Sequence, residues 1–248
     1  MEVNLWTILI ASSLTTVATG LGAIPFFFFK HFNVWWLSIL QAAAAGLMLG
    51  ASFNLIQEGV HLDPYRTFAG LLLGLLLIVL ADYFINKKTD TDLGDLEGGD
   101  ARKALLILGI MTAHSFAEGI GVGVSFGGGE KLGLFITVAI AIHNIPEGLA
   151  ISLVMVPKGT KPWKAAVWSV FSSLPQPLMA VPAFLFVTFF APWLPVGLGL
   201  AAGAMIWMIF AGLIPDAFEG GASRAAIGTA VTLAFAALLA FQQFVLVF

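Results

Sequence analysis

The sequence contains no cysteine and few charged side chains. Without thiols, disulfide bonds and thiolate metal sites are excluded, so a bound metal would need His, carboxylate, amide or Met ligands. Asp, Glu, Lys and Arg make up 10% of the 248 residues, against roughly a quarter in an ordinary soluble domain. The formal net charge of −3 differs from that of a basic nucleic-acid-binding protein, so we expect no nucleic-acid partner.

Hydrophobic residues are in excess, at 59% of the chain with a mean hydropathy of +0.98. An exterior this apolar is stable in a lipid bilayer but not in water. Because a helix needs about 20 apolar residues to cross the hydrocarbon core, the pattern predicts an all-α membrane protein with eight transmembrane helices. The predicted spans are 5–26, 36–60, 67–85, 103–126, 131–156, 164–190, 194–217 and 224–247. No basic residue precedes Lys30, so we expect the first apolar run to be a retained span rather than a signal peptide.

An even number of spans places both termini on one side of the membrane, and the basic residues indicate which side. Lys and Arg accumulate in cytoplasmic loops, and nine of the eleven lie in the odd-numbered connections between spans. These nine are Lys30, Lys87, Lys88, Arg102, Lys103, Lys158, Lys161, Lys164 and Arg224. The even-numbered connections contain Arg66 and Lys131. We therefore predict that both termini are outside.

The most polar segment runs from about residue 86 to residue 103, in the third connection. Its acidic residues are Asp90, Asp92, Asp95, Glu97 and Asp100. We interpret it as a solvated cytoplasmic loop within a single transmembrane domain that covers residues 1–248. A weak metal-collecting function of this loop is the alternative.

Two stretches of consecutive spans align without gaps. They are HSFAEGIGV at His114–Val122 and HNIPEGLAI at His143–Ile151. Since consecutive spans are antiparallel, the repeat is inverted, an arrangement that is common in secondary transporters. A weaker pair is LIQEG at Leu55–Gly59 and LIPDA at Leu213–Ala217.

The stronger repeat carries a candidate metal site. His114 lies eleven residues after Lys103 and His143 twelve after Lys131, which places each roughly 17 Å into its helix, near the middle of the bilayer. Residues four apart share a helix face, so His114 with Glu118, and His143 with Glu147, each form a two-ligand pair. Two imidazoles and two carboxylates suit Zn²⁺, Fe²⁺ or Mn²⁺ and contain too much nitrogen for Mg²⁺ or Ca²⁺.

Four further polar residues are candidates for the metal pathway or the edge of the site. Asn54 and Glu58 form another pair spaced by four residues, near the outside, and Asp216 is the repeat partner of Glu58, near the inside. Gln176 lies between Pro175 and Pro177 in the sixth predicted span, where it is expected to line the cavity.

These motifs resemble those of the ZIP (Zrt/Irt-like) family of metal transporters, in its bacterial form. The resemblance rests on HNIPEGLA at His143–Ala150, its degenerate copy at His114–Gly121, TGLGAIP at Thr19–Pro25, and the eight spans with outside termini. It implies a 3+2+3 bundle in which spans one to three and six to eight are inverted repeats around spans four and five. It also implies that His114, Glu118, His143 and Glu147 bind the metal between spans four and five. A bacterial inner membrane is the implied location.

Members of the family often bind a second metal, held by the two shared glutamates, an Asn or Asp after each first ligand, and an acid in span six. Asn144 keeps this pattern, whereas Ser115 and Gln176 depart from it. We therefore count Asn144 and Gln176 with the metal site and Ser115 with the pathway, and we expect a mononuclear site.

Together these features predict a carrier that moves zinc, and also iron, manganese or cadmium, from outside into the cytoplasm by alternating access. The metal is the transported substrate, and the other partner is the lipid bilayer. The alternative is a membrane-embedded metal-dependent hydrolase or oxygenase that uses the same His/Glu cluster, although no further enzyme motif is present. The sequence leaves open whether two copies form a homodimer.

Overall fold

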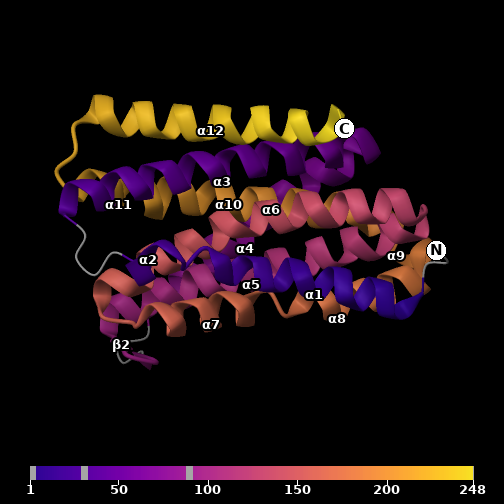
Figure 1. Cartoon of the computed structure of the whole chain (residues 1–248), viewed down its shortest axis with the longest axis horizontal. Helices are drawn as coiled ribbons and strands as arrows, with labels where there is room; N and C mark the ends of the chain where they lie inside the picture. The colour runs from indigo at the N-terminus through magenta and orange to yellow at the C-terminus, as the bar shows by residue number, and fades with distance from the viewer. Residues whose placement is uncertain (1–3, 29–32, 88–91, 248) are drawn as a thin grey trace.

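The computed structural model describes residues 4–28, 33–87 and 92–247, and in this part of the chain it is helical apart from one short hairpin (Figure 1). The long helices are α1 (Leu5–Leu21), α3 (Val34–Leu62), α4 (Pro64–Asn86), α5 (Gly98–Gly127), α6 (Glu130–Met155), α7 (Pro162–Ser172), α8 (Pro175–Leu185), α10 (Leu194–Met208) and α12 (Arg224–Val247). Shorter elements are α2 (Pro25–Phe28), β1 (Asp92–Leu93), β2 (Leu96–Glu97), η1 (Val156–Lys158), α9 (Val187–Phe190), η2 (Ala191–Trp193), η3 (Ile209–Leu213) and α11 (Ile214–Glu219).

Seven of the described helical stretches are long and apolar enough to cross a membrane. The sixth predicted span differs because it is divided into α7 and α8, which have 11 residues each. Proline explains the break, since Pro175 and Pro177 have no backbone N–H to continue the helical hydrogen bonds. The Thr16 hydroxyl of α1 donates to the Ser173 carbonyl at 3.0 Å, so a side chain from another span supports the broken backbone.

Both chain ends lie at the same end of the bundle, and the hairpin lies at the opposite end (Figure 1). This agrees with an even number of membrane crossings. The basic residues Lys30 and Lys88, which contributed to the predicted orientation, lie outside the described residues, as does Asp90.

The acidic segment is more ordered than the predicted loop. Helix α5 begins at Gly98, five residues before the predicted start at 103. Before it, β1 and β2 pair antiparallel, and Gly94 has a positive φ of 60° in the tight turn between them. Leu96 is 2% exposed and belongs to the main apolar core. Residues 92–103 thus form a hairpin and the first turns of α5 where an irregular loop was predicted, because Leu96 anchors the hairpin against the helices, while Asp92, Asp95 and Glu97 remain exposed.

Packing between the helices follows the inverted repeat. Helix α1 packs against α6 as α8 packs against α5, and α3 packs against α12 as α10 packs against α4. In the inverted repeat, α1 corresponds to α7 and α8, α3 to α10, α4 to α12, and α5 to α6. The α1–α6 contact therefore corresponds to the α8–α5 contact, and the α3–α12 contact to the α10–α4 contact. This confirms the 3+2+3 arrangement and divides the helices into two groups. We call α1, α5, α6, α7 and α8 the site bundle, and α3, α4, α10, α11 and α12 the frame bundle.

Glycines allow the closest helix contacts within each bundle. A Cβ placed on Gly70 or Gly74 of α4 would lie 2.1 Å from a carbonyl oxygen of α10, and Gly199 of α10 would meet Thr67 of α4 at the same distance. In the site bundle, Gly148 of α6 would meet the Thr19 carbonyl of α1 at 1.6 Å. Small residues spaced in this way let membrane helices touch backbone to backbone.

Contacts between the two bundles are looser at glycine positions. A Cβ on Gly197 of α10 would lie 3.2 Å from the Ala117 side chain of α5, and one on Gly121 would lie 3.8 Å from Leu194. Side chains rather than backbones therefore separate the two bundles at these positions.

We expect Gly74→Ala to destabilise the protein by about 1–3 kcal/mol, because α4 and α10 would have to move apart. The matched control is Gly109→Ala in α5, where nothing lies within 4 Å of the added carbon and where alanine favours the helix by about 0.5–1 kcal/mol. Thermal unfolding in detergent, followed by size-exclusion chromatography, compares the two variants. Equal melting temperatures would contradict the assigned α4–α10 contact.

Candidate metal centre

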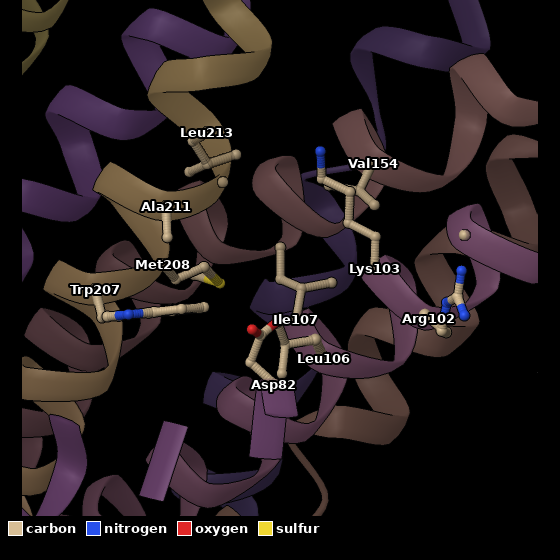
Figure 2. Close-up of a pocket in the computed structure, with 12 residues that line it drawn as sticks. Asp82, Arg102, Lys103, Leu106, Ile107, Val154, Trp207, Met208, Ala211 and Leu213 are labelled. Carbon is tan, nitrogen blue, oxygen red and sulfur yellow. The ribbon is translucent and has the colours of Figure 1, made fainter. Parts of the chain in front are cut away.

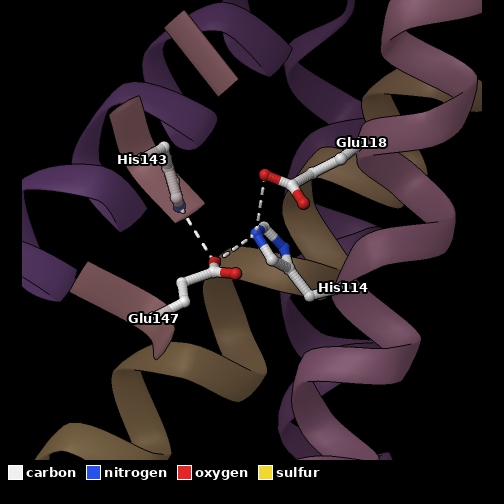
Figure 3. Close-up of side chains that lie close together, drawn as sticks. All are labelled: His114, Glu118, His143 and Glu147. Carbon is white, nitrogen blue, oxygen red and sulfur yellow. Dashed lines mark ion pairs between the residues drawn. The ribbon is translucent and has the colours of Figure 1, made fainter. Parts of the chain in front are cut away.

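The predicted ligands converge at the centre of the site bundle (Figure 3). Helix α5 supplies His114 and Glu118 one turn apart, and α6 supplies His143 and Glu147 in the same way. Their exposed fractions are 1%, 3%, 6% and 0%. One ligand atom from each residue lies within 4.8 Å of all the others. The antiparallel repeat thus brings two equivalent ligand pairs face to face.

Distances within the cluster fit a common central cation. His114 Nε2 lies 2.8 Å from Glu147 Oε1 and 3.4 Å from Glu118 Oε1, and His143 Nε2 lies 3.2 Å from Glu147 Oε1. Four donors around zinc at about 2.0–2.1 Å stand about 3.3 Å apart in a tetrahedron. The two imidazole rings are stacked, with centroids 5.4 Å apart. The donor set is one that Zn²⁺, Fe²⁺ or Mn²⁺ can bind, and these three distances are compatible with tetrahedral coordination.

Many polar atoms of the cluster lack a hydrogen-bond partner among the described residues. The close pairs do not meet with hydrogen-bond geometry, so the following buried atoms are unsatisfied: both ring nitrogens of His114, Nε2 of His143, Oε1 of Glu118 and both carboxylate oxygens of Glu147. Buried polar atoms are normally satisfied, and an ion is one explanation when they are not. Metal coordination would satisfy several of them together.

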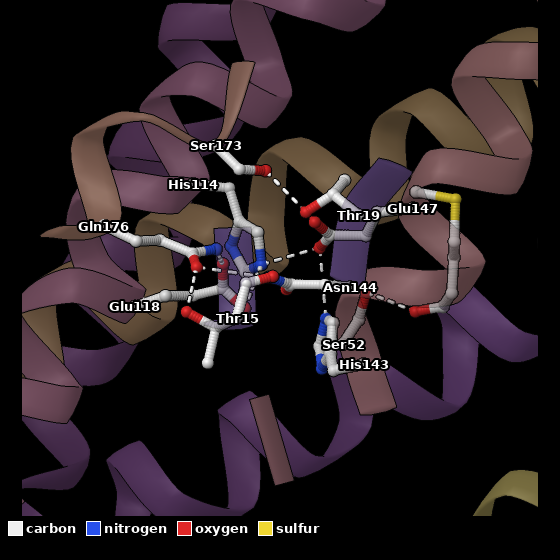
Figure 4. A network of polar contacts seen from close by, with 11 residues as sticks. Thr15, Thr19, Ser52, His114, Glu118, His143, Asn144, Glu147, Ser173 and Gln176 are labelled. Carbon is white, nitrogen blue, oxygen red and sulfur yellow. Dashed lines mark hydrogen bonds and ion pairs between the residues drawn. The ribbon is translucent and has the colours of Figure 1, made fainter. Parts of the chain in front are cut away.

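Amide and hydroxyl side chains from α1, α6 and α8 form a polar layer along one side of the cluster (Figure 4). Gln176 Nε2 donates to Glu118 Oε2 at 2.5 Å, while Gln176 Oε1 accepts from the Thr15 hydroxyl at 2.5 Å and from Asn144 Nδ2 at 3.2 Å. A carboxylate can only accept, so the Gln176 nitrogen must face it. Gln176 was predicted in the metal site, and its oxygen is already used by two donors.

Asn144 and Ser115 occupy different positions in this polar layer. Asn144 Nδ2 also donates to the Thr15 carbonyl at 2.8 Å, which leaves its Oδ1 without a partner. Ser115 is fully buried beside His114, and its hydroxyl has no partner among the described residues either. Both side chains therefore retain an oxygen that could bind a cation or water.

Comparison with known proteins identifies the family. The ZIP Zinc transporter model matches residues 85–188, which extend from the end of α4 through the broken helices α7 and α8. GufA, a zinc transporter of Myxococcus xanthus, is 32% identical over 235 residues, which cover 88% of this chain and 91% of that protein. The zinc transporter ZIPB of Bordetella bronchiseptica is 34% identical over 82% of this chain and 70% of its own length. The chain belongs to the ZIP family.

A plant relative has the higher identity but is much longer. A protein of Arabidopsis thaliana named as a zinc transporter is 46% identical over 240 residues, or 96% of this chain. This chain spans 38% of that protein's length. Membership of the ZIP family decides between the two functions that the sequence left open, because it is a family of transporters and not of enzymes.

In this ZIP protein, a cavity of about 80 Å³ is lined by residues of the cluster and by the C-terminal half of α3. Asn54 and Glu58 line it together with Glu118 and His143. Glu58 itself is exposed and lies four residues before the end of α3 at Leu62. The structure thus brings the two predicted pathway residues of α3 into one cavity with two of the predicted ligands.

Asp216, the predicted inner pathway residue of this ZIP chain, is not part of the cluster. It lies in α11, where both of its carboxylate oxygens accept from Lys103 Nζ of α5. The sequence analysis missed this ion pair. It also missed three threonines of α1 that hydrogen-bond to Gln176 or Ser173, namely Thr15, Thr16 and Thr19. These threonines could have been found from the sequence, because their hydroxyls recur at helical spacing within an apolar span.

Replacing Glu147 by Gln keeps the shape of the side chain and removes its charge. We expect Zn²⁺ to bind roughly 100-fold or more weakly, since even outer hydrogen-bond partners of metal ligands contribute 10–100-fold. The control is Glu130→Gln, in the first turn of the same helix. Equilibrium dialysis of the purified variants measures both affinities, and similar binding by the two would exclude Glu147 as a ligand.

Proposed function

We propose that this ZIP chain carries Zn²⁺ across a cell membrane from outside to cytoplasm, with His114, Glu118, His143 and Glu147 as the transport site. The observation that carries the proposal is the burial of two imidazoles and two carboxylates in one cluster with unsatisfied donor and acceptor atoms. The matched regions of the zinc-transporting relatives, GufA and ZIPB, include this part of the chain.

Charge balance supports a divalent cation as the substrate. An ionised carboxylate at bilayer depth costs several kcal/mol unless it is paired or hydrated. No Lys or Arg occurs in residues 104–130 or 132–157, which contain all four proposed ligands. A dication neutralises Glu118 and Glu147 together. Fe²⁺, Mn²⁺ and Cd²⁺ accept similar ligands, so we include them as secondary substrates, whereas Mg²⁺ and Ca²⁺ prefer sites made of oxygen alone.

The cavity beside α3 and the basic residues support the proposed inward direction. We place both termini outside, with Glu58 and Asn54 at the entrance, because the connections rich in Lys and Arg lie at the opposite end. The acidic segment at 86–103 is then cytoplasmic. In a bacterium the corresponding membrane is the inner membrane.

Alternating access is the proposed mechanism, with residues 1–248 as one transporter unit. One chain supplies all four ligands, so a single copy contains the complete site. The two bundles meet through side chains at Gly197 and Gly121, while backbones touch within each bundle. A shift of one bundle against the other would open the cluster to either side in turn without breaking the glycine contacts.

The role proposed for Gln176 is to orient Glu118 rather than to bind metal. The Gln176 amide donates a hydrogen bond to Glu118 Oε2, the oxygen that a second cation would need as a ligand. Ser115 offers only a neutral hydroxyl. Two dications about 4 Å apart repel strongly in a medium of low dielectric constant, so we propose one metal ion per site.

Transport itself is tested with pure protein in liposomes. We expect Zn²⁺ uptake by the native chain and at least a tenfold loss in Glu118→Ala, because the variant lacks one of the two anionic ligands. Glu219→Ala, in α11, is the control. Normal uptake by a folded Glu118→Ala protein would refute the transport site, and absence of uptake of any divalent metal by the native chain would refute the function.

A gain of a second metal tests the mononuclear site. Gln176→Glu with Ser115→Asn restores the two groups that the chain lacks, so we expect bound zinc to rise from about one to about two ions per chain. Elemental analysis after mild dialysis measures the stoichiometry. Two ions in the native protein would show that the proposed role of Gln176 is wrong.

A further inference from the structure

A second cavity, of about 260 Å³, lies at the inner end of the molecule between the two bundles (Figure 2). The site bundle contributes Lys103, Ile107 and Val154 to its lining, and the frame bundle contributes Asp82 and Leu213. We call this cavity the inner vestibule. Like the outer cavity, it lies on the interface that would rearrange during transport.

The inner vestibule is aligned with the metal cluster. Ile107 precedes His114 by seven residues in α5, and Val154 follows Glu147 by seven in α6. Seven residues are about two helical turns, so both side chains lie on the ligand-bearing faces roughly 10 Å further along. Ile107 and Val154 belong to the main apolar core of the protein. This core also contains one fully buried residue from each of α3, α5, α6 and α10, namely Met48, Met111, Ile151 and Met205.

An ion pair joins the two bundles beside the vestibule. Lys103 lines the vestibule from the first turns of α5, in the site bundle, and donates to Asp216 of α11, in the frame bundle. The Lys103 side chain is 41% exposed and the Asp216 side chain 16%. Two other lysines at this end have partners within their own bundle or its hairpin, since Lys158 contacts Asp100 at 3.2 Å and Lys164 contacts Asp95 at 2.8 Å. The Lys103–Asp216 pair is therefore placed to resist separation of the bundles.

The backbone next to Asp216 is irregular. Residues Ile209–Leu213 form a π-helical turn between α10 and α11. Pro215 follows this turn and lacks the N–H that would bond to the Ala211 carbonyl. π-helical turns within α-helices are frequent at functional sites. Ala211, Gly212 and Leu213 line the vestibule, so this irregular turn borders the vestibule close in sequence to Asp216.

We propose that Lys103 and Asp216 form a latch that holds the inner vestibule closed while the metal site faces outward. The latch rests on the proposed transport function. When the bundles separate at the inner end, the pair breaks, and Asp216 becomes an unpaired carboxylate beside the vestibule. A leaving dication then meets an anionic ligand in the open state, whereas in the closed state the lysine ammonium occupies it.

The strength of the pair suits a latch that opens in every cycle. A partly exposed ion pair shifts an equilibrium by only a few-fold, because water screens the charges. A pair of this kind biases the closed state without trapping it. A fully buried pair would leave two uncompensated charges when it broke and would hold the bundles together too tightly.

Because the chain has no cysteine, a single introduced thiol reports on opening. Ile107→Cys places it on a side chain that is 3% exposed and lines the vestibule. We expect Lys103→Met in this background to raise the labelling rate by a membrane-impermeant maleimide, applied from the inner side, by roughly fivefold. Asp216→Asn should act similarly. Exchange of the two residues, Lys103→Asp with Asp216→Lys, should restore slow labelling.

The control is Lys158→Met, which removes an ion pair within the site bundle and should leave the labelling rate unchanged. Zn²⁺ binding by equilibrium dialysis, measured on the same proteins, separates this inference from the proposed function. Normal zinc binding by every variant, with equal labelling of the Ile107→Cys protein alone and with Lys103→Met or Lys158→Met added, would overturn the latch alone. Loss of zinc binding in the native chain would instead overturn the transport site.

Discussion

Two carboxylates and two imidazoles are the ionisable side chains buried among the described residues of this helix bundle, and their need for compensation shapes the surrounding structure. One oxygen of Glu118 is satisfied by the amide of Gln176, which is held in turn by Thr15 and Asn144. The remaining oxygens and ring nitrogens of the cluster are left for a cation. The break between α7 and α8 belongs to this arrangement, because it brings Gln176 to Glu118 at the start of a new helix.

Glycine explains how a cluster can be rigid in a protein that must move. Helices that carry or support the ligands touch backbone to backbone at Gly119 and Gly148, each of which directly follows a glutamate of the cluster. These contacts fix the spacing of α5 with α8 and of α6 with α1. The interface between the bundles is made of larger side chains and contains the cavities on both sides of the cluster. The close backbone contacts thus lie within each bundle, and the packing that can adjust lies between the bundles.

The charged residues of the inner end stabilise structure there as well as orienting the chain. Asp100 of the acidic segment contacts Lys158 in the connection between α6 and α7, Asp95 contacts Lys164 near the start of α7, and Leu96 anchors the hairpin in the core. Among the described residues, the His/Glu cluster is the group of four with metal-binding spacing, and the acidic segment forms no second such group. The alternative of a metal-collecting loop therefore receives no support from this part of the chain.

The sequence by itself determined the class of the protein, its helical spans and the four residues of the cluster. Hydropathy is a local property, and the spacing of His114 with Glu118 and of His143 with Glu147 follows from the helical turn, so both could be predicted without long-range contacts. The inverted repeat also predicted that the two pairs would meet. Tertiary structure decided which atom of Gln176 faces Glu118, where Asp216 finds its partner, and that the acidic segment folds onto the core. Each of these depends on residues far apart in the chain, such as Lys103 and Asp216, and local pattern contains no information about which distant side chain will supply a hydrogen bond or a charge.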